Sequence, residues 1–257
     1  GESIDFGPCA FMEAYDPQTV FSSIDHGGRY AFENQPLIAR WNLARLAEAL
    51  LPLMASADDE AAVKAAVATV MEVIDAFPAR FETEWHAVLA EKLGLPGPQN
   101  RTGAGAPPDG QADRALADDW LALLQAHEVD MTQAWRALGE AAGGDTGPLW
   151  ALFSATPGPA GDLQSWLDRW TARCQQAAAT SPAERRRAMH RVNPAVIPRN
   201  HLVEAALAAA SDEGRLEPFE ALLAAVQRPY DPEGVDPSFL QPAPAAQTRT
   251  YQTFCGT

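Results

Sequence analysis

Apolar residues recur every three or four positions through the first half of the chain, the spacing of a helix with one buried face. From Pro36 a stripe of this kind predicts a helix over 36–54, with proline at its first turn. The stripe consists of Leu37, Ile38, Trp41, Leu46, Leu50 and Leu53. A second apolar face predicts a helix over 57–77, and a third helix fits 80–93 and ends at Gly94.

The second half of the chain has the same helical pattern. Amphipathic segments predict helices over 112–127, 161–179 and 215–227, and "VDMTQAWRALGEAAGG" predicts a shorter one closed by glycine. "SPAE" at 181–184 has the form of a capping box, and another helix begins near Asn200 after two prolines. Strand signals are nearly absent and no repeat period is found, so we predict a mainly α protein that is not a solenoid.

Three segments lack this periodicity. Residues 1–35 are rich in glycine, aspartate and aromatic residues, which predicts a loop-rich but ordered head. The Gly/Pro-rich stretch 95–112 predicts a flexible loop, and residues 229–257 predict an extended, proline-rich tail with a cysteine near its end. The predicted organisation is therefore head, helical part (36–228) and tail.

Charge narrows the range of partners. The 257 residues are 47% hydrophobic, as in a globular protein, and carry a formal net charge of −15 with a pI of about 4.6. Such an acid excess disfavours nonspecific binding to nucleic acid or to an anionic membrane surface, so we expect neither as a partner. No uninterrupted apolar run approaches the ~20 residues that cross a bilayer.

Cysteine usage and the first residues bear on the compartment. The three cysteines are far apart and form no Cys-x-x-Cys pair, which argues against a zinc knuckle or a disulfide framework. The opening "GESID" has neither the basic nor the apolar segment of a signal peptide. The cytoplasm is the simplest expectation.

The triplet Asp5-Phe6-Gly7 is the first candidate for chemistry. In kinase-like folds the aspartate of such a triplet binds the magnesium ion that bridges ATP phosphates. The chemistry requires a hard oxygen ligand for a hard cation, on a turn that glycine permits. A triplet alone is also compatible with an ordinary turn.

Longer blocks carry more information than the triplet. "ESIDFGPCAFMEAYDP", "SSIDHGGRYAFENQP", "WNLARLAEALLPL", "RVNPAVIPRNHLVEAALAAA", "RPYDP" and the terminal "YQTFCGT" occur in this order. In sequence, order and separation they closely resemble the selenoprotein O family of kinase-like proteins. The resemblance covers most of the chain and is weakest over 95–180.

The resemblance implies a fold and an activity. The chain would form the C-terminal, helical part of a protein-kinase-like fold, with a helical extension particular to the family. Family members bind ATP in a reversed orientation and transfer AMP to Ser, Thr or Tyr hydroxyls of proteins, assisted by Mg²⁺ or Mn²⁺. On this analogy Asp5 is both the metal ligand and an ATP contact.

The same resemblance implies that a longer enzyme was cut shortly before the triplet. The nucleotide-binding lobe, the aspartate base and an asparagine metal ligand would lie upstream, so no catalytic residue is expected in this chain. One carboxylate cannot position a metal-bound triphosphate usefully. We therefore expect the isolated chain to be inactive.

The loop "DHGGRYAF" allows two interpretations. It could belong to the activation segment, where it would position a protein substrate or brace the metal loop. The interpretation we favour is a structural turn in which Asp25 and Arg29 form buried polar bonds. His26 is not expected to act as a base.

The cysteines suggest one redox hypothesis. Relatives often carry cysteine or selenocysteine near the position of Cys255, and some have a partner cysteine in the activation segment. The position of that partner is near Phe21 here, so only Cys9 could replace it, if its Cα lay within roughly 7 Å. Cys174, on a predicted helix beside Trp170, is expected to be inert core.

Other candidates favour structural roles. "ERRRAMHR" holds four arginines and predicts a solvated helix face, although a phosphate or acidic partner would also suit it. Arg199-Asn200 is expected to tie a helix start to the head loop. The tryptophans are expected in the core, and the histidines other than His26 (His86, His127, His190 and His201) show no metal-ligand spacing.

Two alternative functions remain open beside AMP transfer. The chain could be a non-enzymatic helical scaffold that binds a protein through its acidic surface, or part of an enzyme that transfers a phosphoryl group through the same metal ligand. The target protein and the oligomeric state do not follow from the sequence.

Overall fold

The computed structural model describes residues 11–96, 109–156, 158, 160–177, 180–244, 248 and 251. Within this part the chain is mainly helical, as predicted, and a single isolated bridge between Ala14 and Asp130 is its only β pairing. The chain forms two compact units. The described residues of the first unit are 17–85; those of the second are 11–16 and the described residues from His86 to Tyr251.

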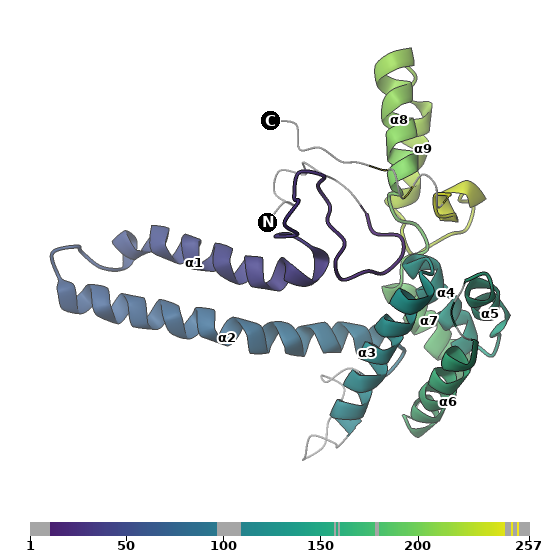
Figure 1. The fold of residues 1–257 in the computed structure, drawn as a ribbon, viewed down its shortest axis with the longest axis horizontal. Coiled ribbons are helices and arrows are strands. Elements are labelled where there is room, and N and C mark those ends of the chain that lie inside the picture. The colour runs from purple at the N-terminus through teal and green to yellow at the C-terminus, as the bar shows by residue number, and fades with distance from the viewer. Residues whose placement is uncertain are drawn as a thin grey trace. The chain divides into compact units, whose positions relative to one another are not determined.

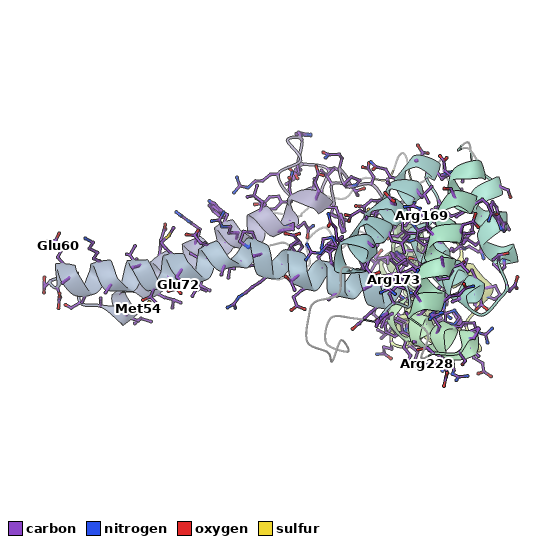
Figure 2. The ribbon with its side chains drawn as sticks, turned by 90° about the horizontal axis from the view of Figure 1, so that it is seen from below. Met54, Glu60, Glu72, Arg169, Arg173 and Arg228 are labelled. Atoms are coloured by element: carbon purple, nitrogen blue, oxygen red, sulfur yellow. The ribbon has the colours of Figure 1, made fainter. Side chains whose placement is uncertain are left out.

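The first unit contains a helical hairpin. The 3-10 helix η2 (Phe32–Asn34) leads into α1 (Gln35–Met54), and a short loop joins α1 to α2 (Glu60–Lys92), which runs beside it (Figure 1). Met54 and Glu60 mark the ends of the two helices at that loop (Figure 2). A salt bridge between Arg40 and Asp75, at 2.7 Å, connects the two helices.

The helices predicted over 57–77 and 80–93 are one continuous helix, so the predicted break is wrong. Pro78 lies inside α2, where it removes one backbone donor and crowds the preceding turn. Proline in a helix interior costs about 3 kcal/mol and usually kinks or ends the helix. Here the helix continues because its side chains remain aligned on both sides of the proline.

An aromatic ladder provides that alignment. Phe77, Phe81 and Trp85 follow one another at intervals of four residues, with stacked rings whose centroids are 6.2 and 6.1 Å apart. Phe32 of η2 adds a tilted contact to Trp85 at 6.2 Å. Such aromatic pairs contribute about 0.5–1.5 kcal/mol each beyond the area they bury, so the ladder offsets much of the cost of Pro78.

The predicted apolar stripe of α1 is present but largely uncovered. Ile38 is its only buried member, whereas Trp41 is 48% exposed, Leu46 54% and Leu53 83%. The prediction of a helix was therefore right, but the core role expected of Trp41 was wrong. The described residues of the first unit supply no second layer of side chains over it.

The second unit has a core built around tryptophan. Trp120 lies at its centre, with ring centroids 4.6 Å from Trp166 and 5.6 Å from Trp135, and Trp166 stacks on Trp170 at 5.9 Å. All four rings are buried, which confirms the predicted core role for them. Their helices and the others of this unit are α3 (Asp109–His127), α4 (Met131–Ala142), α5 (Gly147–Ser154), α6 (Ala160–Gln176), α7 (Pro182–Val192), α8 (Asn200–Glu213) and α9 (Glu217–Val226).

Close helix contacts depend on glycine at two positions. Gly94 ends α2 as predicted, with φ +69°, and a Cβ there would lie 2.8 Å from side-chain atoms of Arg185 and Met189. A Cβ on Gly139 of α4 would lie 2.6 Å from the ring of His190 on α7. Larger residues would therefore separate α7 from both neighbours.

Two local features differ from the predicted pattern. Helix α5 is missing from the prediction because its eight residues stand between Gly/Pro-rich segments; Leu149 and Phe153, both buried, hold it in place. The tail is not simply extended, since Pro237–Leu240 form a 3-10 helix, η4, capped by Asp236.

The predicted capping box of α7, Ser181 with Glu184, is confirmed. None of the described helices is both long and apolar enough to cross a membrane.

A buried lysine joins the end of α2 to the end of α7. Lys92 donates to the carbonyl of Val192 at 3.2 Å and to Oδ1 of Asn193 at 2.8 Å, and its ammonium lies 5.1 Å from the ring centre of Trp135. The Asn193 side chain donates in return to the Lys92 carbonyl. Burial lowers the pKa of Lys92 from 10.5 to about 8.

This pKa predicts a rise of stability with pH. Between about pH 8 and pH 10.5 the unfolded chain binds more protons at Lys92 than the folded chain does, so the free energy of unfolding increases with pH in that window. Lys92→Met should abolish this increase in urea titrations across the window, whereas Lys64→Met, at an exposed position of the same helix, should leave it. An unchanged slope in Lys92→Met would contradict the assignment.

Candidate functional site

The segment Phe11–Asp16, here called the strap, is the described part of the chain nearest in sequence to the Asp5-Phe6-Gly7 triplet. Asp5, the predicted metal ligand and ATP contact, lies outside the described residues. Cys9 and Cys255 do too, so the hypothesis of a switch between them stays a hypothesis. The site is therefore built from what holds the strap.

The first residue of the strap is held by a side chain from α8. The amide N–H of Phe11 donates to Oδ1 of Asn200 at 2.8 Å, and Nδ2 of Asn200 donates back to the Phe11 carbonyl at 3.0 Å. A primary amide that pairs with both polar groups of one residue fixes its backbone as a strand partner would. The prediction that Asn200 ties a helix start to the head is confirmed.

A buried charge cluster holds the middle of the strap. The Arg199 guanidinium, fully buried, donates to both carboxylate oxygens of Asp130, at 2.5 and 3.2 Å, and lies 3.5 Å from Oε1 of Glu13. It also donates to the carbonyl of Leu240 in η4. Forked pairing of this kind is the strongest hydrogen-bonding geometry for arginine and carboxylate. Glu13, Asp130 and Arg199 are called the Arg199 cluster below.

Each member of the Arg199 cluster also binds backbone. Asp130 is the N-cap of α4, and its Oδ1 accepts the amide N–H of Gln133 at 2.7 Å. The Glu13 carbonyl accepts the amide of Met131 at 2.7 Å, while its carboxylate accepts the amide of Ala243 at 2.9 Å. The strap is thus tied to the starts of α4 and α8 and to the tail.

These carboxylates are occupied by structural partners. Glu13 and Asp130 are nearly buried and share one guanidinium, so neither is free to act as a base. His201 lies beside them with Nδ1 3.9 Å from Glu13 Oε1, and that buried nitrogen has no hydrogen-bond partner among the described residues. The cluster positions the strap and does not itself offer reacting groups.

Removal of the Asn200 amide should loosen the start of the strap. Asn200→Ala eliminates both bonds to Phe11, each worth about 1 kcal/mol, so we expect a loss of about 2 kcal/mol in the free energy of unfolding. The Phe11 amide should then exchange with solvent faster in hydrogen-exchange measurements. Asn42→Ala, at an exposed position of α1, is the control and should be neutral or slightly stabilising. An unchanged exchange rate at Phe11 would refute this role of Asn200.

The "DHGGRYAF" loop forms a turn, with different partners from those predicted. The Asp25 carboxylate accepts the amides of Arg29 at 2.9 Å and Tyr30 at 2.8 Å, and Gly28 takes the positive φ of 63°. The Arg29 side chain is exposed and lies 5.1 Å from the ring centre of Trp41. The structural role is therefore confirmed for Asp25, but the buried polar role expected of the Arg29 side chain is wrong.

The arginine run of α7 is not uniformly solvated. Arg185 is buried and donates to the carbonyls of Gly94 and Cys174, which satisfies the ends of two other helices. Arg187 and Arg191 are exposed, as predicted. Cys174 is buried and its pKa is raised to about 11, chiefly by burial, in agreement with its predicted inertness.

The sequence pointed to Arg199 and Asn200 but not to the carboxylates that pair with Arg199. Glu13 and Asp130 were missed, although Asp130 carried a signal: an aspartate three residues before Gln133, at the start of an apolar run, has the form of an N-cap. Glu13 carried no such signal, because its partners lie as far as 230 residues away in the sequence. Only the fold brings them together.

The described features define a mainly α protein in which the segment following a candidate metal ligand is tied to two helix starts and to the tail. A family model described as "Protein adenylyltransferase SelO" matches residues 1–227. A protein of Chromobacterium violaceum described as protein nucleotidyltransferase YdiU is 48% identical over 258 residues, covering 100% of this chain and 50% of that protein.

Two further relatives with the same description give similar figures. Those of Rhodococcus jostii and Mycolicibacterium paratuberculosis are 45% and 47% identical over 100% of this chain, which covers 45% and 47% of their lengths. This chain belongs to the SelO family. It spans about half the length of the curated relatives that it matches.

Proposed function

We propose that this chain is part of a protein adenylyltransferase with a kinase-like fold, which transfers AMP from ATP to Ser, Thr or Tyr hydroxyls of proteins. The observation that carries the proposal is the family match over residues 1–227, which includes Asp5-Phe6-Gly7. The names of the relatives, which describe nucleotidyl transfer, support it further.

Asp5 is the proposed ligand for the divalent ion. A carboxylate is the hard oxygen donor that Mg²⁺ or Mn²⁺ prefers, so the residue type suits the ion. No group of three or more His, Cys, Asp or Glu side chains within the described part of the chain could hold a metal. In the proposal, Asp5 acts with phosphate oxygens, water and ligands from outside this chain. When bound, the ion would neutralise phosphate charge as pyrophosphate leaves.

The strap is proposed to position Asp5. Asn200 fixes the backbone of Phe11, six residues after Asp5, and the Arg199 cluster fixes Glu13. A loop fastened at such short range has fewer conformations open to it, and positioning together with charge stabilisation supplies nearly all of the catalysis in reactions at phosphorus. Asn200 and Arg199 are thus positioning residues.

The chain alone is proposed to be inactive. Transfer of AMP requires a base for the attacking hydroxyl, further metal ligands and a site for the nucleotide, and Asp5 supplies one ligand only. The part of the relatives that this chain does not span is the proposed source of the rest.

The test uses a fusion protein, in which this chain replaces the matching half of the Chromobacterium violaceum relative. The fusion protein is incubated with ATP labelled at the α or the γ phosphate, Mg²⁺ or Mn²⁺, and a mixture of proteins. Label on protein from the α position alone supports AMP transfer. Label from the γ position would instead support a phosphoryl-transferring enzyme, and label from neither a helical scaffold. The isolated chain should label nothing.

A further inference from the structure

The first unit has more exposed than buried large apolar side chains among its described residues. Among its described residues the buried hydrophobic side chains are Ala31, Ile38, Ala66 and Ile74. Its exposed large hydrophobic residues are Val20, Ile24, Leu37, Trp41, Leu43, Leu46, Leu50, Leu53, Met54, Val67, Met71, Val73 and Phe81. Scattered exposed leucines need no explanation, but a unit that exposes most of its large apolar side chains lacks the core that would stabilise it.

Part of this surface is organised as a strip. Leu43, Leu46, Leu50 and Leu53 recur at intervals of three or four residues along α1, and Met54 stands four residues after Leu50, so the five share one face of the helix; each is at least 41% exposed. We call these five residues the α1 ridge. Ile38, the buried residue of α1, does not belong to this series. The ridge is therefore a helix face that no described residue covers.

The length of the relatives indicates what covers the ridge. This chain aligns over its whole length, yet it accounts for only 45–50% of the three relatives compared above. Each relative therefore holds a further stretch of polypeptide of similar size, which is available to cover an exposed apolar face. The second unit already has a tryptophan core, and its exposed apolar residues on α9 and at its N-cap (Leu216, Phe219 and Leu223) form a shorter series than those on α1. The longer uncovered series lies in the first unit.

Charge argues against a second copy of this chain as the occupant. Each copy carries a formal net charge of −15, so pairing two of them brings like charges together. The same acidity disfavours an anionic lipid surface.

We propose that the α1 ridge is the docking surface for the polypeptide that makes up the other half of a SelO-family protein. Burial of the ridge against that half completes the core that the first unit lacks. Docking on α1 would join the two halves of the protein independently of whether the assembled protein transfers AMP.

Hydrogen exchange tests the proposal without reference to activity. The isolated chain and the fusion protein are compared by mass spectrometry, peptide by peptide. Amides of residues 43–54 should exchange about tenfold more slowly, or slower still, in the fusion protein, because local opening there would have to break the docked interface. Peptides from α4 and α7, which pack on each other in the second unit, report in both samples that the fold is intact.

Matched variants locate the surface. Leu46→Glu with Leu50→Glu should remove the slowing in the fusion protein and leave the helix content of the isolated chain unchanged, since both side chains are exposed there. Leu207→Glu is the control, because Leu207 on α8 is 51% exposed, against 54% for Leu46, and lies in the second unit. It should leave the slowing in place.

Two results would overturn the proposal. One is a fusion protein in which α4 and α7 keep their protection while residues 43–54 exchange as fast as in the isolated chain. The other concerns the isolated chain: it sediments as a dimer, and residues 43–54 of that dimer exchange as slowly as in the fusion protein. If Leu46→Glu then makes the isolated chain monomeric, the ridge binds a second copy.

Discussion

Replacement of Asp5 by alanine in the fusion protein is expected to reduce AMP transfer by about 10²–10³-fold or more, the usual cost of removing one electrostatic group at a transition state. The physical reason is that the carboxylate is the only metal ligand that this chain is proposed to supply. The measurement is incorporation of label from α-labelled ATP into protein, at saturating metal.

Two variants make the Asp5 test specific. Asp58→Ala removes an exposed acid from the loop between α1 and α2 and should leave the rate unchanged. Asp5→Asn keeps the size and one oxygen but loses the charge, so it should resemble alanine at low metal concentration and recover part of the rate as metal is raised. Full activity in Asp5→Ala would eliminate Asp5 as a metal ligand and, with it, the proposed role of the strap.

The largest expected effect on stability comes from Arg199→Met. The change leaves two nearly buried carboxylates, Glu13 and Asp130, without their shared cation. Removing one partner of a buried ion pair typically costs about 3–5 kcal/mol, because the remaining charge stays desolvated and unpaired. Chemical denaturation should show a loss of this size, together with faster amide exchange in the strap.

A matched surface pair is the control for Arg199. Arg169 pairs with Asp119 at 2.7 Å, but both side chains are about half exposed, so Arg169→Met should cost about 1 kcal/mol or less. Addition of Asp130→Asn to Arg199→Met should restore part of the loss, because the amide keeps the cap on α4 while removing one buried charge. If the single changes at Arg199 and Arg169 cost the same, the cluster is not a buried ion pair in solution.

Sequence periodicity predicted the helices well because helix formation depends on local spacing. The bounds of α1, α4 and α9 lie within a few residues of the predicted ones. Periodicity failed at Pro78, where stacking of Phe77, Phe81 and Trp85 outweighs a local helix breaker. It also could not show that the α1 stripe is uncovered, since the pattern marks a face that needs a partner without specifying where the partner lies.

The residues of the candidate site were likewise predicted only in part. Asn200 was identified because it stands in a block that resembles the family, and its predicted tie to the head is confirmed by its bonds to Phe11. The role of Glu13 could be identified only from the structure, because its partners are far away in the sequence and its neighbours along the chain do not indicate that it is buried. The prediction for Asp5 stays a prediction, since it lies outside the described residues.

The anchors of the strap come from distant parts of the chain, and this affects when, during synthesis, the strap's contacts can form. Phe11 binds a side chain 189 positions later, and Glu13 accepts an amide 230 positions later. A ribosome therefore makes the strap 230 positions before the last of its partners, so the strap cannot be fully seated until that partner has been translated. At about 5–20 residues per second that interval is roughly 10–50 s.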